Sequence, residues 1–198
     1  MKRIGVLLAA GQSKRMGRPK QLLPWPPKGE NPKPLVAAAF DAIARVCDEM
    51  VVVVGHQAED VVAALGERTF QRTAGDLGSE LFASIRRGLL GASQVDPTAD
   101  VLLQPADHPQ VRLDTLQTLL ARLAENAGLA VMPTYRGKGG HPVCMPMSIV
   151  NEVLGYSGRG GLRQFWIDHP ELCVRLPVDD PGVVFDIDTQ SDYDFCVQ

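Results

Sequence analysis

Short apolar runs alternate along the chain with longer stretches in which apolar residues recur at helical spacing. Residues 4–9 (IGVLLA) form a continuous apolar run bounded by Gly11, the pattern of a strand buried on both faces. Further strands are predicted at 50–55, 69–73, 100–105 and 129–133, and helices at 35–47, 57–65, 79–90 and 113–126. Strands that alternate with helices form parallel βαβ units with right-handed crossovers. The pattern therefore predicts an α/β protein with an open, mostly parallel sheet covered by helices on both faces.

Length and composition narrow the class of protein. A chain of 198 residues is within the usual range of one domain, so we expect one domain over residues 1–198. The net charge of −3 argues against the broad basic face of a nucleic-acid-binding protein, and no apolar stretch approaches the roughly 20 residues of a membrane span. The four cysteines form no CxxC pair, which indicates reduced thiols and not a zinc site. We expect a cytoplasmic protein with no nucleic-acid partner and no membrane partner.

The segment after the first predicted strand is a basic glycine loop, AAGQSKRMGRPK. In open α/β sheets ligands bind outside the carboxyl ends of the strands. Gly11 and Gly17 flank five residues, so the backbone could take positive φ at both ends and turn its N–H groups inward, as an anion-binding nest does. Cations at four positions would add charge-assisted donors: Lys14, Arg15, Arg18 and Lys20. The loop predicts polyphosphate binding, and the alternative is a solvated basic loop without a ligand.

Three familiar motifs do not fit the chain. The loop lacks the spacing of a Walker A motif, and no GxGxxG fingerprint follows the first strand, which argues against a nicotinamide or flavin enzyme. In GYSGRG, residues 155–160, arginine stands where a nucleophile elbow needs glycine. A hydrolase of that class is therefore excluded.

Carboxylates occur where two other segments are expected to reach the same edge of the sheet. Asp107 follows the predicted strand 100–105, and Asp186 and Asp188 lie two apart, so on a strand both would point to one face. Proteins commonly hold Mg²⁺ on a phosphate chain through one or two carboxylates. The structural alternatives are a turn or cap role for Asp107 and a helix start at Asp188-Thr189. The basic loop and the carboxylates together favour a metal–nucleotide site.

Two other features lie near these segments. His108 and His141 each precede a proline close to a predicted strand end and are candidates for lining the cleft, although no histidine spacing supports a His-based metal site. The proline-rich segment PWPPKGENPKP, residues 24–34, is expected to be an exposed loop, neither helix nor central strand.

The stretch LAAGQSKRMGRPKQLLP resembles the signature of the MobA-like nucleotidyltransferases, L-A-[AG]-G-x-S-x-R-M-G-x-x-K-x-L, and every fixed position from Leu8 to Leu22 is matched. Later segments follow the order of the same family, including LLQPADHP, GGHPV, SGRGGLRQF and FDIDTQSDY. The combination of LAAG, QPADHP, GHPV and DIDT is most similar to the molybdenum cofactor cytidylyltransferases, since the guanylyltransferase branch more often has LAGG.

The resemblance implies a Rossmann-like three-layer αβα sandwich of the nucleotide-diphospho-sugar transferase type. It implies Mg²⁺-dependent transfer of CMP from CTP to the phosphate of molybdopterin or the molybdenum cofactor, with release of pyrophosphate, and a molybdoenzyme as a further partner. Arg15 and Lys20 would be catalytic, and Asp107 with Asp186 or Asp188 would bind the metal. The other implied site residues are Leu8, Ala9, Ala10, Gly11, Ser13, Gly17, Gly78, Ser79 and Asp107 for the nucleotide, and His141 and Gly160 on the acceptor side.

Several alternatives stay open. The chain could use another NTP or another phosphorylated acceptor, or it could bind a nucleotide or cofactor without transfer. A nucleotide-sugar pyrophosphorylase shares the fold, but such enzymes usually add strands that hold the sugar. The chain also departs from the family, which has a short turn where residues 24–34 stand and carries asparagine and tryptophan in the neighbourhood of Ala74 and Leu77.

Overall fold

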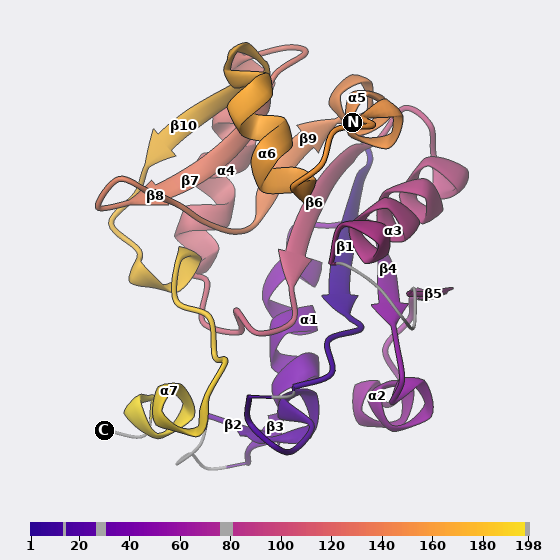
Figure 1. Ribbon diagram of the computed structural model, residues 1–198, viewed down its shortest axis with the longest axis vertical. Coiled ribbons are helices and arrows are strands. Elements are labelled where there is room, and N and C mark those ends of the chain that lie inside the picture. The colour runs from indigo at the N-terminus through magenta and orange to yellow at the C-terminus, as the bar shows by residue number, and fades with distance from the viewer. Residues whose placement is uncertain (14, 27–30, 76–80, 197–198) are drawn as a thin grey trace.

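A central sheet with helices on both faces organises the chain (Figure 1). The computed structural model describes residues 1–13, 15–26, 31–75 and 81–196. The eight-stranded sheet has the order β10-β7-β9-β6-β1-β4-β5, with β8 paired to β7. Its strands are β1 (Arg3–Ala9), β4 (Glu49–Val54), β5 (Gln71–Ala74), β6 (Asp100–Pro105), β7 (Ala130–Tyr135), β8 (Lys138–Gly139), β9 (Val143–Pro146) and β10 (Cys173–Pro177).

The sheet is mostly parallel, as predicted. β1 pairs in parallel with β4 and β6, β4 with β5, and β7 with β10. β9 is antiparallel to both β6 and β7, and β8 is antiparallel to β7. The five strands predicted from the sequence are present within two residues at each end, whereas the apolar pattern did not predict β9 and β10 as strands.

The helices form one layer on each face of the sheet. α3 (Leu81–Val95), α5 (Met147–Gly155) and α6 (Gly161–Asp168) share one apolar core, and α1 (Leu35–Ala44), α2 (Ala58–Leu65) and α4 (Leu113–Glu125) cover the other face. The four predicted helices are present, and residues 79 and 80 of the third prediction lie outside the described residues. This confirms the predicted three-layer αβα architecture.

The sequence of β1 explains why both faces of the sheet are covered. Ile4, Val6 and Leu8 belong to the core under α3, while Leu7 and Ala9 belong to the core under α1. Successive side chains of a strand point to opposite faces, so a continuous apolar run must be buried on both. No helix in the described ranges is both long and apolar enough to cross a membrane.

The carboxyl ends of β1, β4 and β6 lie at one edge of the sheet, the lower edge in Figure 1. A 3₁₀ turn (Lys20–Leu22), the short pair β2 (Pro24–Trp25) with β3 (Lys33–Pro34), and α7 (Gln190–Phe195) complete this edge. The expectation of a loop over 24–34 was therefore wrong at its two ends, which pair as short antiparallel strands, and residues 27–30 lie outside the described residues.

Asp186 and Asp188 do not lie on a strand. They occupy an irregular segment between a 3₁₀ turn (Pro181–Val183) and α7. Thr189 forms the N-cap of α7 in a capping box with Asp192, so the expected helix start at Asp188-Thr189 is confirmed.

Candidate nucleotide and acceptor site

A polar cavity of about 570 Å³ opens at the carboxyl ends of β1 and β6. Its lining comes from the loop after β1, from Lys20, from Asp107 after β6, and from Asp186 and Asp188 before α7. The sequence therefore identified the segments that meet here, although Lys20 and Asp107 are 87 residues apart.

Lys20 is the centre of this cluster. Its Nζ donates to Asp107 Oδ2 at 2.7 Å and to Asp188 Oδ1 at 2.8 Å. Lys20 is only 9% exposed, and the 3₁₀ turn that carries it packs against α1 and α2. One cation thus holds two carboxylates from distant segments at a single point.

The charged forms of this cluster support one another. Burial alone would lower the pKa of Lys20, but the charges of and hydrogen bonds to Asp107 and Asp188 outweigh it and raise that pKa. Burial opposes the ionised form of Asp107, yet the hydrogen bond with and charge of His108, together with Lys20, hold the pKa of Asp107 well below its usual range. The site is therefore charged, with a cation between anions, at neutral pH.

Asp186 and Asp188 differ in their surroundings. Burial and the hydrogen bond shared with Asp188 raise the pKa of Asp186, while Lys20 outweighs the burial of Asp188 and lowers its pKa. Arg15 Nη2 also lies 2.5 Å from Asp188 Oδ2. Asp188 therefore ionises more readily than Asp186, and its two oxygens face Lys20 and Arg15.

A buried residue between the two aspartates fixes this segment. The Ile187 side chain is fully buried, and the Ile187 N–H donates to the carbonyl of Asp107 at 3.2 Å. This backbone hydrogen bond joins the segment before α7 to the end of β6. It brings all three carboxyl groups to one place without a strand.

The glycine loop adopts a different conformation from the expected one. Gly17 has a positive φ of 69°, but at the other end the left-handed residue is Ser13, with φ 50°, and not Gly11. Ser13 Oγ accepts from the Lys20 N–H at 3.1 Å and donates to Gln21 Oε1 at 3.1 Å. Gln21 Nε2 in turn donates to the Gly11 carbonyl at 2.6 Å. Hydrogen bonds of the Ser13 and Gln21 side chains thus hold the loop in place around Lys20.

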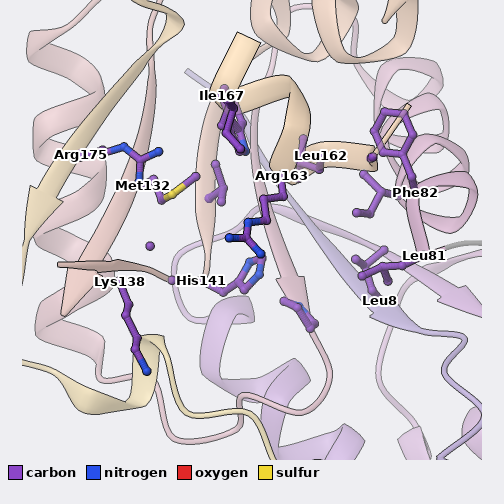
Figure 2. A pocket seen from close by; sticks show the side chains of 18 of the residues that line it. Leu8, Leu81, Phe82, Met132, Lys138, His141, Leu162, Arg163, Ile167 and Arg175 are labelled. Atoms are coloured by element: carbon purple, nitrogen blue, oxygen red, sulfur yellow. The ribbon is translucent and has the colours of Figure 1, made fainter. Parts of the chain in front are cut away.

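A second cavity of about 990 Å³ adjoins the first (Figure 2). Leu8, Leu81, Pro105 and His141 line both cavities. The second cavity lies between α3, α6 and the strands β7 to β9, and most of its wall is apolar. Two joined spaces of this kind suit two substrates that meet at their junction.

His141 stands at this junction. Its N–H donates to the Val183 carbonyl at 2.7 Å, and a Cβ on Gly140 would lie 2.2 Å from the same oxygen, so only glycine permits the approach. Burial lowers the pKa of His141 to about 4, so its ring is neutral at pH 7, and its Nδ1 has no partner among the described residues. The ring lies edge-on to His108, with ring centres 5.3 Å apart.

The predicted site residues fall into four groups. Those that line the first cavity are Leu8, Ala10, Gly11, Arg15, Lys20, Asp107, Asp186 and Asp188, and those that line the second include His141 and Gly160. Ala9, Ser13 and Gly17 line neither cavity: the Ala9 side chain is in the core under α1, and Ser13 and Gly17 shape the loop. Gly78 and Ser79 lie outside the described residues.

Sequence reasoning missed Gln21, and it predicted His108 only as a residue that lines the cleft; His108 does line the first cavity. Gln21 is 3% exposed although it is polar, and its position beside Lys20 in the loop was the available signal. His108 is 5% exposed, and its Nδ1 lies 2.9 Å from Asp107 Oδ1. His108 and Asp107 are neighbours in the chain, but the pairing of their side chains could be expected only once the end of β6 was known to lie just before them.

The carboxylates suit a divalent cation that also contacts phosphate. Asp107 Oδ2 and Asp188 Oδ1 already converge on one positive group, the Lys20 ammonium. Among the residues that the structure describes, no group of three or more His, Cys, Asp or Glu residues forms a closed metal cage. Two hard oxygen donors, with phosphate and water completing the shell, are what Mg²⁺ requires.

Comparison with known proteins supports this description. Residues 5–172 match the family described as MobA-like NTP transferase domain. The nicotine blue oxidoreductase of Paenarthrobacter nicotinovorans is 29% identical over 93% of this chain and 91% of its own length. The molybdenum cofactor cytidylyltransferase of Escherichia coli (strain K12) is 23% identical over 95% of this chain and 92% of its own length.

Solved structures agree with the fold. The crystal structure of Rv0371c from Mycobacterium tuberculosis H37Rv is 28% identical, with a TM-score of 0.81 over 99% of this chain and 97% of that chain. The complex of the same protein with manganese is 26% identical, with a TM-score of 0.78 over 99% of this chain and 98% of that chain. The fold is that of the nucleotide-diphospho-sugar transferases, as the sequence predicted. With most of its length matched in sequence and nearly all of it in structure, the chain belongs to the MobA-like NTP transferase family.

Proposed function

We propose that this chain transfers CMP from CTP to the phosphate of molybdopterin or the molybdenum cofactor and releases pyrophosphate. Nucleotidyl transfer itself is supported by the family. The likeness to a molybdenum cofactor cytidylyltransferase and the LAAG stretch support the finer assignment of nucleotide and acceptor. The observation that carries the proposal is the convergence of Lys20, Asp107 and Asp188 in a cavity that adjoins a second, larger one.

The chemistry needs little covalent help from the protein. An oxygen of the acceptor phosphate attacks the α-phosphorus of the NTP in line, a new P–O bond forms, and the bond to pyrophosphate breaks. The acceptor phosphate is already ionised at neutral pH, so no general base is required. Catalysis then depends on positioning and on stabilising the charge that develops on the phosphate oxygens.

The residues of the first cavity have distinct roles in this proposal. Asp107 and Asp188 would hold Mg²⁺ at the point where their oxygens now meet the Lys20 ammonium. Bound there, the metal would neutralise charge on the triphosphate. Lys20 would donate to the reacting phosphate in place of the carboxylates, and Arg15, which is exposed, would bind the outer phosphates. The manganese complex of a structural neighbour supports the use of a divalent cation.

Asp186 has a different role from Asp188. Only Asp188 shares the Lys20 ammonium with Asp107, and Asp186 shares a hydrogen bond with Asp188 instead. We therefore assign the second metal ligand to Asp188 and regard Asp186 as the residue that orients it.

A pyrophosphate release assay tests the proposal. Purified protein is incubated with Mg²⁺, each of the four common NTPs in turn, and molybdopterin or its molybdenum form. The expected result is release with CTP alone that depends on the acceptor and stops in excess EDTA. Release with GTP in preference to CTP would reject the cytidylyl assignment. Tight CTP binding without release to any acceptor would instead support a binding protein that does not transfer.

A further inference from the structure

The second cavity is larger than it would need to be to hold the reacting phosphate alone. Its volume of about 990 Å³ is at the upper end of the range of ligand pockets, about 300–1,000 Å³. Two of the large apolar side chains exposed in the described chain lie at it, Leu81 at 67% and Ile167 at 57% exposure. Exposed apolar surface that lines a cavity is suited to contact with an apolar part of a ligand.

The wall of this cavity has an unusual chemical composition. Among the described residues that line it, no side chain is a carboxylate, an amide or a hydroxyl. Apart from His141 and the indole N–H of Trp166, the polar side chains are Lys138, Arg163 and Arg175, which come from β8, α6 and β10. The wall thus offers cationic donors and apolar surface, and side-chain acceptors are missing from its described part.

These three cations have no partner in the described part of the chain. In that part of the chain, none of the three makes an ion pair or a side-chain hydrogen bond. Arg15, Arg68 and Arg72, by contrast, are all paired with carboxylates. Unpaired cations around a concave apolar surface favour an anion, since its charge is not already neutralised by the protein.

Two of the three cations, Lys138 and Arg175, lie away from the residues that the two cavities share. In Figure 2, Lys138 and Arg175 are on one side of the cavity and Leu8, Leu81 and Phe82 on the other, with Arg163 and His141 between them. Leu8, Leu81 and His141 are three of the four residues that the second cavity shares with the nucleotide cavity, the fourth being Pro105. A phosphate that reacts beside Lys20 is therefore separated from Lys138 and Arg175 by the breadth of a mostly apolar cavity, with Arg163 and His141 between the two sides.

We infer, on the basis of the proposed function, that the acceptor carries a second anionic group joined to its reacting phosphate through an apolar or flat aromatic body. Arg163 and Arg175 bind that second group, Lys138 adds to the positive field, and the wall around Phe82 and Ile167 covers the body. These are specificity-determining residues for the acceptor and take no part in the transfer step. Acceptors with a single anionic group bind more weakly.

Two synthetic probes test this inference without the natural acceptor. One is 1-naphthyl phosphate, and the other is the same compound with a sulfonate on the far ring. Their affinities are measured by calorimetry in the presence of Mg²⁺ and saturating α,β-methylene-CTP, which occupies the phosphate loop and cannot react. We expect the sulfonated probe to bind about tenfold more tightly, the gain of an added charge-assisted contact.

Charge-neutral variants identify the residues responsible. In Arg163→Gln and in Arg175→Gln the advantage of the sulfonated probe should fall to about twofold or less. Arg87→Gln, an exposed arginine on α3 that lines neither cavity, is the matched control and should keep the full advantage. Equal binding of the two probes by the wild type, or an advantage that survives both substitutions, would overturn the inference.

The result separates this inference from the proposed function. A sulfonate advantage that is lost in the two variants would support the inference even if no pyrophosphate were released with any NTP. Conversely, transfer to molybdopterin with no sulfonate advantage would support the proposed function and reject the inference. Melting temperatures of the variants, expected to equal that of the wild type, show that the fold is retained.

Discussion

Replacing Lys20 by methionine removes the cation between Asp107 and Asp188 and keeps an unbranched side chain of similar length. The Lys20 side chain is 11% exposed, and its Nζ lies 2.7 Å and 2.8 Å from the two carboxylates. Removing one member of a buried ion pair typically costs about 3–5 kcal/mol. The side chains of Asp107 and Asp188 are 17% and 20% exposed, and they keep their contacts with His108 and Arg15. We therefore expect a smaller loss, about 2–3 kcal/mol, in the free energy of unfolding at pH 7.

The loss should depend on pH in a defined direction. The pKa of Asp107 is depressed in the folded protein, so its stabilisation is present above the ordinary pKa of about 3.9 and is lost as the pH falls through its lower folded value. The pKa of Lys20 is raised, so its contribution is complete below the ordinary value of about 10.4 and is lost as the pH rises through the folded value. The difference between wild type and Lys20→Met is therefore largest from about pH 5 to pH 9.

Urea unfolding followed by circular dichroism measures this difference. Lys33→Met is the matched control, because Lys33 also pairs with a carboxylate, Asp41, at 2.6 Å but is 43% exposed, and Asp41 keeps its contacts with Arg68. The control should lose less than about 1 kcal/mol. Adding Mg²⁺ should restore part of the stability of Lys20→Met by placing a cation between the carboxylates. Equal losses in the two variants at pH 7, or a difference that grows below pH 4, would refute the role given to Lys20.

Three other outcomes are expected. Asp180→Ala should lose about 3 kcal/mol in the free energy of unfolding, measured with urea, because Asp180 is 2% exposed and accepts hydrogen bonds from three donors. Asp114→Ala, at an exposed position, should lose almost nothing. Arg15→Gln should change the free energy of unfolding by no more than about 0.5 kcal/mol, since the Arg15 side chain is 71% exposed. The same variant should raise KM for the NTP about tenfold, and an unchanged KM would show that Arg15 does not bind the phosphates. Asp188→Asn should lower the affinity for Mn²⁺ in the presence of CTP, measured by electron paramagnetic resonance, by more than Asp186→Asn does, and the reverse order would exchange their roles.

The sequence predicted the elements whose pattern is set by local burial. The run of residues 4–9 is apolar at every position because β1 is covered on both faces, and such a run can be recognised without knowledge of its neighbours. Lys20 and Asp107 could be placed at one edge of the sheet because each follows a strand that was predicted to be parallel to the other. β1 and β6 do pair in parallel, and both end at that edge. Distant residues could thus be brought together from the expected parallel direction of the strands alone.

The remaining features depend on contacts that no local pattern reveals. The segment of Asp186 and Asp188 is held by the buried Ile187 and its backbone hydrogen bond to Asp107. The alternation of FDID is typical of a strand, yet this segment pairs with no strand in the described part of the chain. At the start of the glycine loop the left-handed residue is Ser13 and not Gly11, and the Ser13 hydroxyl joins Lys20 and Gln21, a contact that a rule based on glycine overlooks. The short pairing of β2 with β3 joins residues on both sides of a proline-rich stretch that alone indicates only a loop.

Transfer of a label from the nucleotide tests the central claim most directly. CTP labelled at the α-phosphorus, and separately at the γ-phosphorus, is incubated with Mg²⁺, molybdopterin and either the wild type or Lys20→Met. The predicted result for the wild type is α-label in the acceptor product and γ-label in pyrophosphate, with the rate falling by a factor of about 10²–10³ in Lys20→Met. Label from the γ-phosphorus in the acceptor, or an unchanged rate in Lys20→Met, would contradict nucleotidyl transfer at this cluster.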